Sequence, residues 1–133
     1  MRVSLVSVLV DDQAKALAFY TDILGFEKMA DMPIGDARWL TVTSPDGVEG
    51  EEVVLEPIGF PPARDYQKAL YEAGIPITAF LTKDIQAEYE KLVARGVKFR
   101  GEPQNFGTII VTRFEDTCGN LINLVQPLVG PNA

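Results

Sequence analysis

The sequence predicts an α+β protein built from two βαβββ modules. The stretch Val10–Phe26, VDDQAKALAFYTDILGF, has the pattern of the end of a strand, a capped helix, and a glycine that ends the helix before another strand begins. A looser copy of this pattern, TKDIQAEYEKLVARGVKF, returns from Thr82 to Phe99. Short β-rich runs separated by turn residues follow each copy, as in the strands of a sheet. We therefore expect the 133 residues to form a single domain made of one unit used twice.

The first module is expected over residues 1–58. Residues 2–10, RVSLVSVLV, are aliphatic and β-branched and predict a strand. Asp11-Asp12 supplies an N-cap for the helix that follows, and Gly25 is placed to end this helix after Leu24. The apolar stripe of the helix comprises Ala16, Leu17, Tyr20, Ile23 and Leu24. Three further strands are predicted at Phe26–Met32, Arg38–Thr43 and Glu52–Pro57, with turns at Pro33–Asp36 and Ser44–Gly47.

A linker over residues 59–74 and a second module over residues 75–129 complete the chain. The segment Ile58–Asp65 is predicted to be a loop, and a short helix is predicted at Tyr66–Ala73, with its end at Gly74. The second module begins with a strand predicted at Ile75–Thr82 and a helix that Asp84 caps and Gly96 ends. The apolar stripe of this helix comprises Ile85, Tyr89, Leu92 and Val93. After it the sequence predicts a strand at Val97–Arg100, a loop at Gly101–Gly107, a strand at Thr108–Phe114, a turn at Asp116–Asn120 and a strand at Leu121–Gln126.

Composition excludes several classes of function. The net charge of −7 and the scattered basic residues argue against a nucleic-acid-binding protein, whereas an acidic surface is compatible with a cationic ligand. No apolar run approaches the roughly 18 residues that a membrane span needs. Cys118 is the single cysteine, which excludes an internal disulfide and suits the reducing cytoplasm, where we expect the protein. The sequence contains no histidine, so the commonest metal ligand and general base is absent.

The order of motifs identifies a family. The chain has VDD…A..FY…LGF after the first strand, a VVLEP strand, DI.AEYEKL..RGV.F, and a closing F.D..GN.I.L. This order resembles the vicinal oxygen chelate superfamily, which includes glyoxalase I, extradiol dioxygenases, and bleomycin and fosfomycin resistance proteins. The resemblance implies that the paired modules form a cupped mixed sheet, the glyoxalase/bleomycin resistance/dioxygenase fold, with the ligand on its concave face. It also implies a homodimer, formed in some members by exchange of modules.

The metal ligands typical of this superfamily are mostly replaced in this chain. Metal-using members supply one ligand from the first and one from the last strand of each module. The matching positions here are Leu5, Glu56, Ile77 and Asn123. Aliphatic side chains offer no lone pair and an amide oxygen is a weak donor, so only Glu56 is a strong ligand. We therefore expect no metal and no other cofactor; a divalent metal is the alternative that these positions do not support.

Strand alternation assigns side chains to the expected cup. If Glu56 points inward, Glu52 and Val54 do so as well, and Leu121, Asn123 and Val125 line the cup from the last strand. Of the two faces of RWLTVT, the one with Trp39 and Thr41 fits the cup better; ordinary core packing is the other interpretation of Trp39. Phe106 lies in a loop that is a candidate lid for the cup, and a plain connection between strands is the other interpretation of this loop. Arg113 or Arg38 is a candidate cationic partner for Glu56. The predicted ligand-binding residues are Trp39, Thr41, Glu56, Phe106, Arg113 and Asn123.

Three functions are consistent with these residues. The preferred hypothesis is a metal-independent protein of the bleomycin-resistance type that sequesters an organic molecule, with a role in antibiotic resistance. The second is a lyase, isomerase or dioxygenase that uses a metal or Glu56 as its catalytic acid or base. The third is a structural module whose cup is filled by its own side chains. Cys118 is expected to be a turn residue, because no base is available to activate a thiol.

Overall fold

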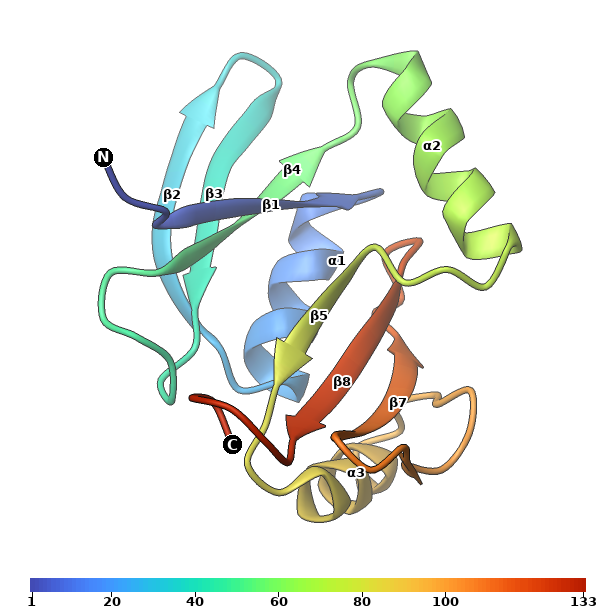
Figure 1. Cartoon of the computed structure of the whole chain (residues 1–133). Helices are drawn as coiled ribbons and strands as arrows, with labels where there is room; N and C mark the ends of the chain where they lie inside the picture. The colour runs from blue at the N-terminus through green and yellow to red at the C-terminus, as the bar shows by residue number, and fades with distance from the viewer.

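The computed structural model describes residues 1–133 as two four-stranded mixed sheets with helices packed against them (Figure 1). The first sheet has the order β1-β4-β3-β2, in which β1 (Leu5–Val10) runs parallel to β4 (Glu52–Pro57). β3 (Ala37–Thr43) pairs antiparallel with β4 and with β2 (Glu27–Ile34). This sheet and its helix form the first βαβββ module.

The second sheet repeats this arrangement in the order β5-β8-β7-β6. β5 (Thr78–Leu81) is parallel to β8 (Leu121–Pro127), which pairs antiparallel with β7 (Ile109–Glu115). The two-residue strand β6 (Gln104–Asn105) completes the sheet. The predicted α+β class and the two βαβββ modules are therefore confirmed, with each module forming a sheet of its own.

The predicted helix boundaries of the modules are confirmed at their caps. α1 (Gln13–Ala18) begins after Asp12, whose carboxylate accepts from Lys15 N at 3.0 Å. It continues into a π-helical turn, η1 (Phe19–Ile23), and the chain then turns at Gly25, where φ is +82°. α3 (Ile85–Ala94) begins after Asp84, which accepts from Ala87 N at 3.1 Å, and Gly96 follows it with φ of +87°. Glycine adopts such positive φ values without steric cost, which explains both helix ends.

Three predictions about the remaining elements are wrong. α2 spans Pro61–Glu72 and thus begins within the predicted loop, because Pro61 and Pro62 occupy the first helical positions, where a missing N–H costs nothing. Residues 97–100 form no strand: Val97 is buried and Phe99 makes only an isolated bridge to Phe114. The loop predicted at 101–107 contains β6 instead.

One hydrophobic core extends over both modules. Val8, Leu40 and Leu55 from the first sheet belong to the same buried cluster as Ile122 and Leu124 from the second. The rings of Phe19 and Tyr20 extend this cluster from η1 toward Phe114 and Phe80, at centroid distances of 6.4 and 6.3 Å. In Figure 1, α1 accordingly lies between the two sheets.

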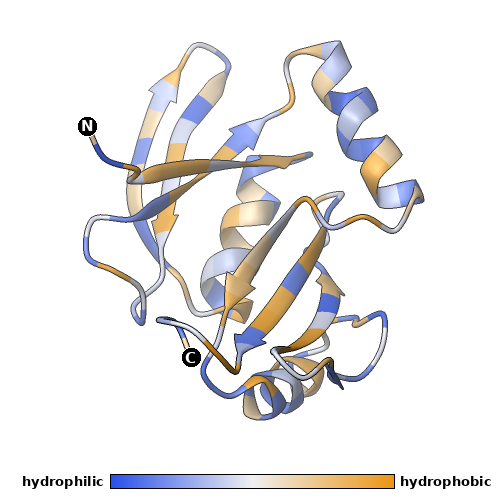
Figure 2. Cartoon of the chain, in the orientation of Figure 1, coloured by the Kyte–Doolittle hydropathy of each residue, from blue (hydrophilic) through white to orange (hydrophobic).

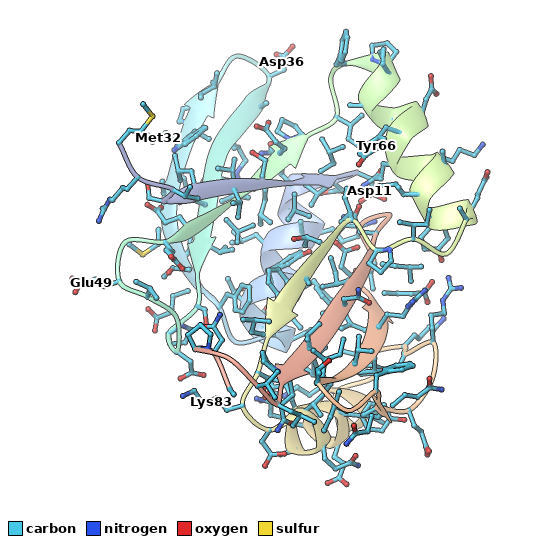
Figure 3. The ribbon with its side chains drawn as sticks, in the orientation of Figure 1. Asp11, Met32, Asp36, Glu49, Tyr66 and Lys83 are labelled. Carbon is cyan, nitrogen blue, oxygen red and sulfur yellow. The ribbon has the colours of Figure 1, made fainter.

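The linker helix α2 packs differently from α1. Gln67 is its only buried residue, and most of α2 is coloured hydrophilic or neutral in Figure 2. Tyr66, labelled in Figure 3, is 58% exposed. No helix of the structure has the length and apolarity of a membrane-crossing segment.

Candidate functional site

The first sheet has one face that no helix covers, which we call the open face of the first sheet. Its side chains alternate with core residues such as Leu40 and Leu55, which are fully buried on the other face. Ladder partners lie on the same face, so Met32 accompanies Trp39 and Thr41 accompanies Val54. The open face comprises Leu5, Ser7, Leu9, Met32, Trp39, Thr41, Thr43, Glu52, Val54 and Glu56. Leu5 is 47% exposed and Met32, labelled in Figure 3, is 55% exposed, so the face presents apolar area to solvent.

Glu56 lies on the open face without a cationic partner. Its one side-chain hydrogen bond is from Ser7 Oγ, which donates to Oε1 over 3.3 Å. The two arginines considered as partners bind elsewhere: Arg38 pairs with Asp31 at 2.7 Å, and Arg113 donates to Gly74 O at 2.6 Å. Neither candidate arginine is therefore the partner of Glu56.

Thr41 and Glu52 form a hydrogen-bonded pair on this face. Thr41 is fully buried, donates from Oγ1 to Glu52 Oε1 at 2.6 Å, and accepts from Ala30 N at 3.0 Å. Both functions of the hydroxyl are thus used within the sheet. In this arrangement Thr41 orients Glu52, a second open-face carboxylate that the sequence analysis placed in the cup but did not select. Trp39 is half-buried beside Met32.

The other predicted site residues lie on the second sheet or beside it. Arg113 in β7 is paired with Asn123 in β8, on the face that alternates with the core residues Phe114 and Leu124. Asn123 Oδ1 is buried and has no hydrogen-bond partner, which is unusual for a buried polar atom. Phe106 lies between β6 and β7 and is 64% exposed. No hydrogen bond links this group to Trp39, Thr41 or Glu56.

A buried polar network that the sequence analysis missed connects the two modules. Asp116 accepts from Tyr20 Oη at 2.8 Å and from Asn120 Nδ2 at 2.7 Å, and its other oxygen accepts two backbone N–H groups of the turn. Asn120 Nδ2 also donates to Leu9 O at 2.7 Å. Gln67 Nε2 donates to the same carbonyl at 3.0 Å and to Asn120 Oδ1 at 3.0 Å. The network joins η1, α2, the β7–β8 turn and the end of β1.

Electrostatics in this network follow from burial. Loss of solvent raises the pKa of Asp116 above its ordinary value, although four donated hydrogen bonds oppose the rise. Burial likewise raises the pKa of Tyr20 well above its ordinary value, and the carboxylate of Asp116 raises it further. Cys118 is fully buried in the same turn, and desolvation raises the pKa of its thiol to about 12. A thiol in this environment is unsuited to nucleophilic chemistry.

The potential metal-ligating side chains do not form a cluster. No group of three or more His, Cys, Asp or Glu residues is arranged to hold a metal ion. On the open face, Glu52 and Glu56 are the available carboxylates, and Thr41 and Ser7 respectively are their hydrogen-bond partners. Two carboxylates without a third strong ligand do not make a transition-metal site of the usual kind.

Comparison with known proteins gives one consistent result. A model of the Glyoxalase/Bleomycin resistance protein/Dioxygenase superfamily matches residues 2–124. The uncharacterized protein YurT of Bacillus subtilis is 47% identical over 126 residues, which cover 95% of this chain and 99% of that protein. Among solved structures, UcmS2 is 36% identical with a TM-score of 0.75, over 94% of this chain and 97% of that one. TnmS3, an antibiotic binding protein from Streptomyces sp. CB03234, is 33% identical with a TM-score of 0.74, over 96% of each chain.

Proposed function

The chain belongs to the glyoxalase/bleomycin resistance protein/dioxygenase superfamily, and from this premise we propose that it is a metal-independent protein that binds and sequesters a small organic molecule. The observation that carries the proposal is the open face of the first sheet, where apolar side chains surround a carboxylate without a cationic partner. TnmS3, described as an antibiotic binding protein, supports a binding role. A role in antibiotic resistance is part of the proposal.

The residues on the open face suggest the chemistry of the ligand. Leu5, Met32 and Trp39 provide an apolar surface for a flat or aliphatic body. Glu56 and Glu52 provide acceptors, which favours a ligand with a cationic or hydrogen-bond-donating group. On the second sheet, Asn123, Phe106 and Arg113 are proposed to complete the binding surface, and the buried Oδ1 of Asn123 is without a partner inside the protein.

We further propose that the protein acts as a homodimer in the cytoplasm. Exposed apolar side chains occur on both sheets: Leu5 is 47% exposed, Ile34 is 57% exposed and Leu81 is 56% exposed. We propose that these side chains form part of the surface that the partner subunit covers. Analytical ultracentrifugation tests the dimer, and a monomer at all protein concentrations would contradict it. The free thiol of Cys118 is in keeping with a reducing compartment.

A thermal-shift screen against antibiotics and cationic metabolites tests the binding function. A ligand at about one hundred times its Kd stabilises the folded state by about 2.7 kcal/mol, which is readily measured. Glu56→Gln keeps the shape of the side chain and removes its charge, so it should reduce the shift caused by a cationic ligand. Glu102→Gln, at an exposed position without side-chain hydrogen bonds, is the matched control. If no compound stabilises the protein, the binding proposal is wrong.

An enzymatic role of Glu56 remains the second candidate. The observation that favours it is a carboxylate held by a hydroxyl, Ser7 Oγ, beside an exposed apolar surface. Retained ligand binding with complete loss of turnover in Glu56→Gln would support proton transfer. A stoichiometric transition metal, found by elemental analysis of protein purified without chelator, would instead overturn the metal-independent proposal.

A further inference from the structure

A cavity of about 420 Å³ lies away from the open face, between η1, the end of α2, the segment after α3 and the β7–β8 turn. Its volume is in the range typical of small-molecule pockets. It is lined by Phe19, Ile23, Tyr71, Arg95, Gly96, Val97, Lys98, Glu115, Thr117, Gly119 and Asn120. None of the residues predicted to bind the ligand belongs to this lining.

The wall formed by the segment after α3 is positively charged. Residues 91–101, KLVARGVKFRG, comprise the end of α3 and the segment after it, and contain four basic residues and no acidic one in a chain with a net charge of −7. Of these four, Arg95 and Lys98 line the cavity. Lys98 has neither an ion-pair nor a side-chain hydrogen-bond partner. Arg95 Nη1 donates to Ile23 O at 2.6 Å, which holds the guanidinium at the cavity while its other N–H groups stay available.

Glu115, the single carboxylate in the lining, is paired with a cation of the protein itself. Glu115 accepts hydrogen bonds from Tyr71 Oη and from Arg100 Nη2, the latter at 3.2 Å. The hydrogen bond from Tyr71, the hydrogen bond and charge of Arg100 and, as the smallest cause, the charge of Lys98 lower the pKa of Glu115, so it is ionised at neutral pH. The negative charge of Glu115 is therefore balanced mainly by Arg100, its direct ion-pair partner, which leaves Arg95 and most of the charge of Lys98 for a ligand.

The floor of the cavity is apolar and aromatic. Phe19 is 7% exposed and belongs to the core, and Ile23 packs against it from the same turn. Tyr71 contributes a ring that is fixed by its bond to Glu115 and by the guanidinium of Arg100, 5.4 Å from the ring centroid. Such a floor accepts a flat hydrocarbon body, whereas the cations favour an anionic group at its edge.

We propose that this cavity is a second binding site, for a small organic anion with a planar apolar body, such as an aromatic carboxylate. The site is independent of the one on the open face, because its lining shares no residue with that face and its charge has the opposite sign. Arg95 and Lys98 bind the anionic group, and Phe19 and Tyr71 contact the planar body.

A ¹⁵N NMR titration with 1-naphthoate and its neutral amide, 1-naphthamide, tests this site. The naphthoate should shift the amide signals of Gly96 and Gly119 in a saturable manner and leave that of Ser7, on the open face, unchanged. The two probes have the same shape, so the neutral amide should bind about tenfold more weakly, as expected for loss of charge-assisted hydrogen bonds.

Substitutions of two exposed lysines show whether naphthoate binds in this cavity. Lys98→Gln should weaken naphthoate binding about tenfold with little effect on stability, because the exposed side chain makes no hydrogen bond and no ion pair. Lys91→Gln in the same segment, where the side chain pairs with Glu88 outside the cavity, should leave binding unchanged. The proposal is overturned if naphthoate does not bind, if it shifts Ser7 alone, if the two probes bind equally, or if both lysine variants behave alike.

Discussion

Replacement of Tyr20 by phenylalanine isolates the hydrogen bond that connects η1 to the β7–β8 turn. Tyr20 is fully buried, and its hydroxyl donates to Asp116 Oδ2 at 2.8 Å. All four polar partners of Asp116 are donors in this network, so the carboxylate acts as an acceptor. Removal of one donor to a charged, buried acceptor is expected to cost about 2 kcal/mol of unfolding free energy. For a chain of 133 residues this corresponds to a decrease in Tm of about 7 °C.

The pH dependence of this effect has a defined sign. The pKa of Asp116 in the folded protein lies above its ordinary value of 3.8, so its contribution to stability is full below that value and is lost as the pH rises through the folded pKa. The hydroxyl of Tyr20 favours the ionised carboxylate. The cost of Tyr20→Phe is therefore largest above the folded pKa of Asp116 and decreases as the pH falls below it.

Urea unfolding of Tyr20→Phe at neutral and acidic pH is the assay, and Tyr89→Phe is the matched control. Tyr89 is half-buried against Phe99, with ring centroids 4.7 Å apart, and its hydroxyl makes no hydrogen bond. The control should change stability by less than about 0.5 kcal/mol. Equal effects of the two substitutions, or a cost of Tyr20→Phe that does not change with pH, would refute the reasoning.

Three further predictions concern single residues. Cys118, buried with a pKa of about 12, should resist iodoacetamide in the native protein at neutral pH and react fully after unfolding; rapid native labelling would show that the turn opens. Asp84→Ala removes the cap on Ala87 N and should cost about 1 kcal/mol in urea unfolding, whereas Asp46→Ala, outside any helix, should cost little. Gly119→Ala places a Cβ 2.8 Å from Gln67 Oε1 at a φ of +97°, so a decrease in unfolding free energy of about 2 kcal/mol is expected; unchanged stability would mean that Gln67 moves freely.

The parts of the fold that were predicted correctly depend on local chemistry. Asp12, Asp84, Gly25 and Gly96 cap or end helices through the atoms of neighbouring residues, so their roles can be read from a few adjacent positions. The strand predicted at residues 97–100 shows the limit of this approach. Its alternating side chains pack into the core, but the backbone is not incorporated into a ladder, and only the tertiary structure decides that.

The candidate site likewise combines features that follow from local sequence with features that only the tertiary structure decides. That Glu52 and Glu56 share one face of β4 followed from strand alternation, which is a local rule. The polar network could not be predicted, because Tyr20 and Asp116 are 96 residues apart and each alone had a simpler interpretation, as a core residue and a turn residue. The sequence also could not decide whether Glu56 has an arginine partner, because the charge of Arg38 and Arg113 does not show which carboxylate or carbonyl lies nearest to each of them.

The carbonyl of Leu9 has a consequence for how the two halves of the chain can evolve. It accepts hydrogen bonds from Gln67 in the linker helix and from Asn120 in the second half, although it belongs to the first strand of the first half. Two copies of a duplicated unit can usually drift apart in sequence while each keeps its own interior. Here the acceptor is a main-chain carbonyl, which every residue type supplies, so the residue at position 9 can change while Gln67 and Asn120 must keep donors that reach it.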